Sequence, residues 1–362
     1  MFLTVKVKRF IAILLSVFAI AGFFMYFTEN PVKQLSSESY KSFEKMQKTG
    51  NIILSPVSPE EIIEKDKDFI KWVDFSITST ALKDAMKSDI SSYNDKTRIN
   101  WIKLLACLGV KYGGYFKRYK KSDLEKLVTQ FKNGEKPSEI SSKYYDYYHD
   151  AYSAVLSGYI GEYTLVEDGK NETKYGLKAF SPIANGYYFS HFDDFGSSRS
   201  YGYKRKHLGH DLMASVGTPV IAVESGTVEA LGWNQYGGWR IGIRSFDKKR
   251  YYYYAHLRKD HPYAYMLTEG SVVKAGDVIG YVGMTGYSAK ENVNNIDTPH
   301  LHFGIQLIFD ESQKDGNGEI WIDCYEITKF LLQNKSSVYK DTEKNDYFRK
   351  TEFFEKSLDN LE

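Results

Sequence analysis

The sequence predicts a mainly β domain over residues 179–334, an all-α domain on its N-terminal side and one transmembrane helix. Three observations support this prediction. In the C-terminal half, histidines and other polar residues alternate with apolar residues, as they do along a strand with one buried face. Apolar residues recur at helical spacing between about residues 59 and 167. Near the N-terminus, an uninterrupted apolar stretch is long enough to cross a bilayer.

Overall composition excludes few functions but gives useful limits. The chain has 362 residues, enough for about two domains. Lysine and arginine total 48 against 46 aspartates and glutamates, a net charge of +2, so there is no global signal for nucleic acid and we expect none as a partner. Only Cys107 and Cys324 occur, too few and too far apart for a disulfide framework or a cysteine metal site.

The N-terminal segment indicates export. Lys6, Lys8 and Arg9 precede the apolar residues 10–27, and basic residues on this side place residues 1–9 in the cytoplasm. The rest of the chain would then be extracytoplasmic, attached to the membrane by a single-pass anchor and a polar tether over residues 28–58. The alternative is a signal peptide cleaved after residues 19–21, which would make the protein secreted.

Residues 59–168 are expected to form a separate helical domain of unknown role that could contact a protein partner. Helical periodicity is clear in residues 100–108 and 124–131, with a stop signal at Asn133 and Gly134 and a restart at Pro137. Residues 169–178 are polar and are expected to be an interdomain linker. Residues 335–362 are expected to be a charged, peripheral C-terminal tail.

Several histidines of the β domain occur in short settings that indicate a metal site. His300 and His302 are two apart, so on a strand they project from the same face while Leu301 turns into the core. His207 and Asp211 are four apart, which puts them on one face of either an extended segment or a helix. Two histidines and one carboxylate fit a catalytic zinc site, which keeps the fourth ligand position for water. Residues 217–228 contain two β-rich runs separated by Ser225 and Gly226, as in a hairpin.

The stretch from roughly Phe180 to Phe309 resembles the lysostaphin-type (LytM-like) zinc metalloendopeptidases, which cut peptidoglycan peptides. The resemblance implies an antiparallel β-sandwich of the duplicated hybrid motif type, with the metal in a groove between loops. It rests on ordered motifs: His207-x-Gly209-x-Asp211, Gly217-Thr218-Pro219-Val220, Tyr254-Ala255-His256-Leu257, Gly283-x-Thr285-Gly286 and His300-Leu301-His302-Phe303.

The resemblance implies that His207, Asp211 and His302 bind one Zn²⁺, and that His256 and His300 flank the catalytic water. No His-Glu-x-x-His helix is present, so His256 or His300 would replace the glutamate base of such zinc proteases. The implied function is a membrane-anchored, extracytoplasmic zinc endopeptidase that hydrolyses peptidoglycan stem or cross-bridge peptides during cell-wall remodelling. The alternative is a non-catalytic scaffold or activator in a division or sporulation assembly, although scaffolds of this fold usually lack motif residues and none is missing here.

Further residues near the motifs have open interpretations. His210 is at an odd offset from His207 and Asp211, so we expect it to point away from the ligands. Arg199 either contacts substrate or is a solvated surface residue. Tyrosines 251–254 would alternate across a strand, two facing in and two facing out. Residues 259–269 and 287–298 form longer loops than the family pattern, and we expect substrate choice to depend on them.

Overall fold

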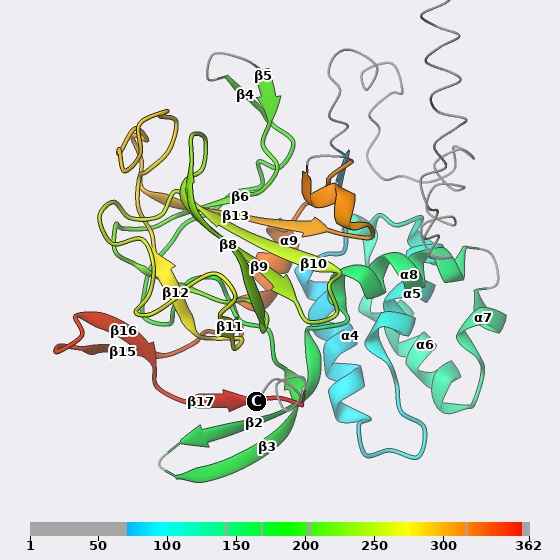
Figure 1. Cartoon of the computed structure of the whole chain (residues 1–362). Coiled ribbons are helices and arrows are strands. Elements are labelled where there is room, and N and C mark those ends of the chain that lie inside the picture. The colour runs from blue at the N-terminus through cyan, green and yellow to red at the C-terminus, as the bar shows by residue number, and fades with distance from the viewer. Residues whose placement is uncertain (1–70, 142–143, 168, 201–203, 316–317, 357–362) are drawn as a thin grey trace, which may run out of the picture. The chain divides into compact units, whose positions relative to one another are not determined.

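The computed structural model describes residues 71–141, 144–167, 169–200, 204–315 and 318–356 (Figure 1). The predicted cytoplasmic tip, transmembrane segment and tether over residues 1–58 lie outside this range. In the part of the chain that is described, no helix has the length and apolar character needed to cross a membrane.

The helical region has the predicted helices at close to their predicted positions. Asn100 caps α5 by accepting a hydrogen bond from the backbone N–H of Lys103. Helix α6 ends at Lys132, directly before the predicted stop, and α7 starts at Pro137. The helices are α4 (Ser79–Ser91), α5 (Trp101–Tyr112), α6 (Lys121–Lys132), α7 (Pro137–Ile140) and α8 (Tyr145–Leu156), with a short 3₁₀ turn, η1 (Phe116–Arg118).

A large sheet forms the frame of the β part. Its strands, in spatial order, are β1 (Lys71–Val73), β14 (Ile320–Ile322), β13 (His300–Leu307), β10 (Arg250–Ala255), β9 (Gly238–Ser245), β8 (Gly226–Asn234) and β11 (Val272–Val273). Strand β6 (His210–Met213) also pairs with β13. All pairs are antiparallel except β1 with β14. The sheet therefore agrees with the mainly β, antiparallel prediction.

A smaller layer covers one face of this sheet. Strands β7 (Pro219–Ile221) and β12 (Val278–Tyr281) pair with each other, and Gly280 of β12 lies against the side chains of Ile241 and Leu257. The predicted hairpin over residues 217–228 is wrong, because β7 and β8 belong to different sheets. Gly226 does not make a turn; it lies within β8, where a Cβ atom would stand 2.2 Å from the carbonyl oxygen of Arg244.

Three further predictions, for the helical domain, the linker and the C-terminal tail, are wrong in part or whole. The all-α prediction fails at its edges, because β1 and β2 (Ile160–Glu167) are strands. The predicted linker is instead β3 (Lys170–Leu177), which pairs with β2 along its whole length. The predicted peripheral tail contains β15 (Val338–Asp341), β16 (Asp346–Arg349) and β17 (Glu352–Phe354), and β17 pairs with β2. Phe353 of β17 is fully buried against Phe180 and Tyr163, so this segment completes a core.

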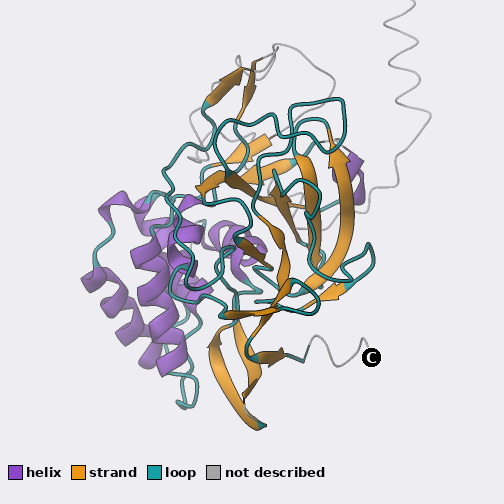
Figure 2. Cartoon of the chain, turned by 90° about the vertical axis from the view of Figure 1, so that its left-hand side faces the viewer, coloured by secondary structure: helices purple, strands orange, loops and turns teal. Residues whose placement is uncertain are grey.

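The helical region packs directly on the β part instead of forming a domain of its own. Both views show the helices gathered on one side of the sheet (Figures 1 and 2). Trp101 of α5 stacks on Phe330 of α9 (Tyr325–Leu331), with ring centroids 6.0 Å apart. Buried Arg250 of β10 donates a hydrogen bond to the carbonyl of Ala154 in α8 and is held by Glu224. All described residues accordingly fall within one compact unit.

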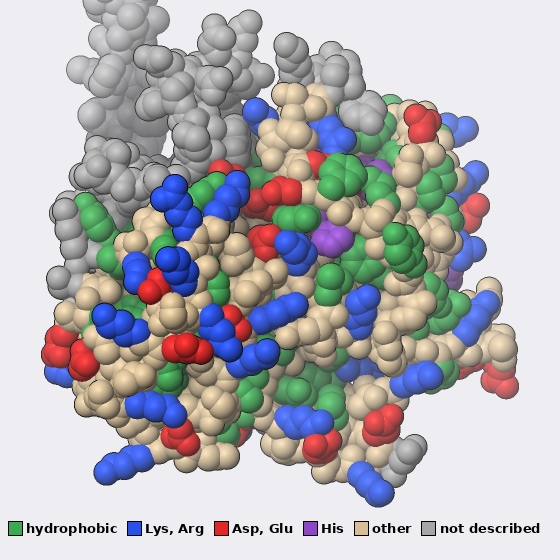
Figure 3. Space-filling view, turned by 180° about the vertical axis from the view of Figure 1, so that it is seen from behind, with side chains coloured by type: hydrophobic (Ala, Val, Ile, Leu, Met, Phe, Trp, Pro, Cys, Tyr) green, Lys and Arg blue, Asp and Glu red, His purple; other side chains and the backbone are tan. Residues whose placement is uncertain are grey.

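Charges are mixed on the surface. On the face seen in Figure 3, lysine and arginine side chains alternate with aspartate and glutamate over the helical and the β parts alike. This agrees with the small net charge of the chain. No broad field of one sign is visible on this face.

Candidate metal centre and active site

Three potential ligands converge where β6 pairs with β13. His302 is directly opposite Asp211 in this register, and His207 lies in the loop that leads into β6. Nε2 of His207, Oδ1 of Asp211 and Nδ1 of His302 are each 3.0 Å from the other two. These residues form the single group of metal-binding geometry found among the described histidines, cysteines and carboxylates.

This donor set fits zinc. Ligands placed tetrahedrally at about 2.0–2.1 Å from Zn²⁺ stand about 3.3 Å from one another, close to the observed separations. Two neutral imidazole nitrogens and one carboxylate oxygen leave one tetrahedral position free, as in catalytic zinc sites. The extended alternative for His207 and Asp211 is the correct one, since Asp211 lies on a strand and no helix is present at this point.

Gly209 allows the ligands to come together. A Cβ atom at this position would stand 2.5 Å from Cε1 and Nε2 of His302 and 2.9 Å from the carbonyl oxygen of Phe303. Such distances are shorter than van der Waals contact, so a side chain would displace the imidazole. The glycine between His207 and Asp211 is therefore a requirement of close packing against His302.

Asp194 is a residue of the centre that the sequence analysis missed. Its Oδ2 is 3.1 Å from Nδ1 of His207, so Nδ1–H donates to the carboxylate and Nε2 is left free for the metal. Burial alone would lower the pKa of His207, but Asp194 and Asp211 outweigh this effect and raise the pKa to about 9 in the metal-free protein. Asp194 is 13 residues before His207, and no spacing rule connects the two.

Arg199 lies within the same cluster. Its guanidinium donates to Asp194 and, at 3.1 Å, to Oδ2 of Asp211, the oxygen that does not face the two histidine ligands. Arg199 is thus not a solvated surface residue, and it also lines the groove, so the substrate-contact alternative stays open. It connects the carboxylate that orients His207 with the carboxylate ligand.

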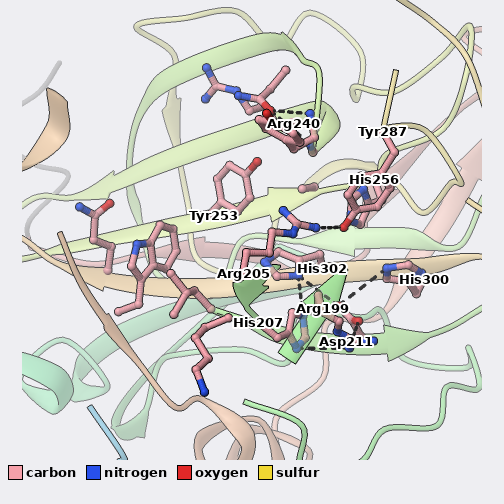
Figure 4. A pocket seen from close by; sticks show the side chains of 18 of the residues that line it. Arg199, Arg205, His207, Asp211, Arg240, Tyr253, His256, Tyr287, His300 and His302 are labelled. Atoms are coloured by element: carbon pink, nitrogen blue, oxygen red, sulfur yellow. Dashed lines mark hydrogen bonds and ion pairs between the residues drawn. The ribbon is translucent and has the colours of Figure 1, made fainter. Parts of the chain in front are cut away.

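His256 and His300 lie beside the three ligands, as the resemblance implied (Figure 4). The ring centroid of His256 is 4.8 Å from that of His300 and 5.8 Å from that of His302. Nδ1–H of His256 donates to the carbonyl of Thr285 at 2.9 Å, and Nδ1–H of His300 donates to the carbonyl of Thr298 at 2.8 Å. Both rings are therefore held as the tautomer whose Nε2 carries the lone pair.

The backbone of His256 is unusual. Its φ of 61° lies in the left-handed region, which residues other than glycine rarely adopt and which occurs often at functional sites. His256 follows the last residue of β10, and this conformation turns its ring towards His300. Burial lowers the pKa of His256 well below its ordinary value, so the imidazole is neutral near pH 7.

His210 is not part of the ligand set, as predicted. Its Nε2 is 2.8 Å from Nδ1 of His191, and burial lowers its pKa to about 3. Its backbone pairs with Phe303, one position away from the His302–Asp211 pair, so its side chain points to the opposite face of the sheet.

A groove runs from the metal centre along the sheet. Tyr251 and Tyr253 line it, whereas Tyr252 and Tyr254 are fully buried in the core, which confirms the predicted alternation. The loop over residues 287–298 contributes Tyr287, Ile296, Asp297 and Thr298 to the groove. In contrast, no described residue of the 259–269 loop lines it, so the expectation for that loop is not supported. The groove also has no lining residue from helices α4 to α8 within the described chain.

A β groove holding a two-histidine, one-carboxylate centre and two further oriented histidines defines a zinc hydrolase class of site. Residues 205–315 match the model of peptidase family M23. An L-Ala–D-Glu endopeptidase of Bacillus subtilis is 38% identical over 149 residues, which are 41% of this chain and 44% of that protein. A glycyl-glycine endopeptidase, ALE-1, of Staphylococcus capitis is 40% identical over 98 residues, 27% of this chain and 24% of that protein.

The solved catalytic domain of lysostaphin from Staphylococcus simulans is 31% identical, with a TM-score of 0.30, and covers 39% of this chain and 92% of that domain. The matches to the two curated relatives span less than half of the length of each. Residues 205–315 therefore match a metalloendopeptidase family, and the His207, Asp211 and His302 centre inside this range fits zinc.

Proposed function

We propose that the protein is a zinc endopeptidase that hydrolyses peptide bonds in peptidoglycan stem or cross-bridge peptides during cell-wall remodelling. The observation that supports it most is the complete set of five side chains, in which three donor atoms converge and two further imidazoles face them. The names of the relatives, an L-Ala–D-Glu endopeptidase and a glycyl-glycine endopeptidase, support the same reaction on wall peptides.

The residues have distinct roles in this proposal. His207, Asp211 and His302 hold the metal, and Zn²⁺ when bound supplies a Lewis acid that polarises the scissile carbonyl and acidifies water. Nε2 of His256 and Nε2 of His300 both carry a lone pair, because each Nδ1–H is already donated to a backbone carbonyl. One of these imidazoles accepts the proton of the attacking water and returns it to the leaving amine.

The test uses the full chain in mild detergent with purified peptidoglycan. We expect release of soluble peptides, loss of that release on chelation and its return with added zinc. His302→Ala should abolish release, and His149→Ala, which alters a histidine of helix α8, should not. Mass analysis of the new amino termini identifies the bond that is cut. Release that persists under chelation, or no release by the zinc-loaded protein, would count against the proposal.

We further propose that residues 10–27 anchor the protein in the membrane with the M23 domain on the outer side. The support is the sequence alone: a basic tip, an apolar stretch of spanning length and a polar tether. Membrane fractionation and protease treatment of intact cells test this. A protein found only in the soluble fraction, at full length, would contradict the anchor.

A further inference from the structure

The register of the sheet aligns one more charged side chain with the metal centre. Asp211 pairs with His302, and His302 pairs with Ala255. Tyr253, two residues before Ala255 on β10, pairs with Gly242, which is two residues after Arg240 on β9. Directly opposed residues of neighbouring antiparallel strands share a face. Arg240 therefore projects into the groove from the same face as the metal ligands.

The distance from the centre is short. Arg240 is two strands away from His302, which corresponds to about 10 Å between their Cα atoms. Ala255 of β10 lies between the strands of Arg240 and His302, and its small side chain leaves the groove open between these two residues. Figure 4 shows Arg240 on the far side of Tyr253 from Asp211. Arg240 and the metal centre thus face one continuous groove.

Arg240 has no carboxylate within ion-pair distance among the described residues, unlike Arg199 and Arg244. Arg244, four residues along the same strand, is paired with Glu311 at 2.8 Å and with Glu229 at 3.7 Å. Arg199 is paired with Asp194 and Asp211. Glu229 is the acidic side chain of the groove on β8, and Lys314 holds it at 3.1 Å.

The surroundings of Arg240 are those of an incomplete binding site. Its Nε is shielded from solvent and has no hydrogen-bond partner, while the rest of the guanidinium is hydrogen-bonded to Tyr251 and carries no carboxylate. A half-buried cation without a counter-ion is unfavourable unless a ligand supplies the missing charge. The planar guanidinium fits a carboxylate through two parallel N–H···O bonds.

We propose that Arg240 binds a carboxylate of the peptide substrate and thereby selects an acidic stem peptide over a neutral, glycine-only bridge. This inference rests on the proposed endopeptidase function. A glutamyl residue that uses one carboxyl group in the peptide chain keeps the other one free, whereas a glycine bridge carries no side-chain carboxylate. Because an extended peptide advances about 3.3 Å per residue, the carboxylate lies within about three residues of the scissile bond.

The decisive experiment compares two synthetic peptides with the zinc-loaded full chain. The peptides are identical except that the free carboxylate of a D-glutamyl residue beside the scissile L-Ala bond is replaced by a carboxamide. We expect kcat/KM to be about 10-fold or more higher for the acidic peptide, as for a hydrogen-bonded ion pair. A pentaglycine peptide should be a poorer substrate than the acidic one.

Variants then assign the preference to Arg240. Arg240→Gln should lower kcat/KM for the acidic peptide by about 10–100-fold and leave the amidated peptide nearly unchanged. Arg240→Lys should recover only part of the preference. Lysine keeps the positive charge but lacks the planar guanidinium that forms two parallel hydrogen bonds with a carboxylate. Lys249→Gln is the matched control, since it removes an exposed cation at the turn before β10.

Each outcome is informative. Equal cleavage of the acidic and amidated peptides by the wild type, or faster cleavage of pentaglycine, overturns the inference and leaves the endopeptidase function intact. An unchanged preference in Arg240→Gln also overturns it. Cleavage of none of the three peptides by zinc-loaded protein contradicts the proposed function instead. If Arg240→Gln loses its zinc or its fold, the wild-type comparison of the peptides still decides.

Discussion

At the scale of single residues, the metal centre depends on groups that hold the ligands as much as on the ligands. Asp194 orients His207, and carbonyls of Thr285 and Thr298 orient His256 and His300. Gly209 leaves room for the His302 ring. A ligand whose ring is already oriented loses little freedom on binding, so these contacts favour metal binding without touching the metal.

Asp194→Asn should weaken zinc binding by about 10–100-fold, the range found when a carboxylate that orients a histidine ligand is removed. The variant keeps the size of the side chain and loses the charge that accepts from Nδ1 of His207. Competition with a chromogenic chelator measures the affinity. Asp193→Asn is the control, because this exposed neighbour has no contact with His207 among the described interactions. Equal affinities of the two variants would show that Asp194 has no positioning role.

Gly209→Ala should lower both zinc affinity and stability, because the new methyl group would stand 2.5 Å from the His302 ring. We expect destabilisation of about 1–3 kcal/mol, as for overpacking of a dense interior. Urea unfolding and zinc titration measure the two effects. Gly161→Ala on β2 is the control, since its methyl group would meet only the flexible chain of Lys178. Wild-type zinc affinity in Gly209→Ala would contradict this account.

At the scale of elements, one buried ion-pair network connects the strands to the helical region. Arg250 of β10 is 1% exposed and makes two hydrogen bonds to Glu224, which follows β7. It also donates to the carbonyl of Ala154 in α8. A Cβ atom on Gly158, just after α8, would stand 1.7 Å from the Glu224 carboxylate, so this end of the helix is packed tightly onto the network.

Glu224→Gln should therefore destabilise the protein by about 3 kcal/mol, because a buried guanidinium loses its main counter-ion. The lower end of the usual range applies, since Asp247 still faces Arg250 at 2.8 Å. Urea unfolding gives the free energy. Glu311→Gln, which alters the 67% exposed partner of buried Arg244, should change stability by less than about 1 kcal/mol. Similar losses in the two variants would contradict the role of burial.

At the scale of the whole molecule, segments from the two ends of the described chain meet around Asp323, which follows β14. Its backbone N–H donates to the carbonyl of Val73, at the end of β1. Burial raises the pKa of Asp323 to about 7, and the nearby carboxylates of Asp193, Asp74 and Glu326 add to this effect. The native state therefore holds this proton at a pH where the unfolded chain has released it.

The raised pKa of Asp323 makes the stability of the protein depend on pH. A carboxyl group with a raised native pKa contributes stability below its unfolded pKa of about 4, and that contribution is lost as the pH rises to about 7. Asp323→Asn removes this loss, so the variant should gain stability relative to the wild type between pH 5 and pH 8. Urea unfolding of both proteins across this range measures the gain. Asp95→Asn, at an exposed carboxylate, should show no such trend, and a flat difference for Asp323→Asn would refute the assignment.

The sequence alone determined the features that depend on local spacing. Residues that are two apart on a strand share a face, so His300 and His302 could be paired. The same rule separated Tyr251 and Tyr253 from their core-facing neighbours. Local cap and stop signals likewise placed α5, α6 and α7. The order of motifs in the resemblance then indicated all five site residues, including His256, whose role no spacing rule gives.

Only the tertiary structure decided which distant segments meet. It brought Asp194 to His207, aligned Arg240 with His302 across two strands, paired β17 with β2 and separated β7 from β8 into different sheets. These contacts depend on how strands far apart in the chain choose their partners, and that choice minimises buried unpaired groups over the whole core. A local pattern specifies which way a side chain points, whereas the packing of the entire chain specifies what it points at.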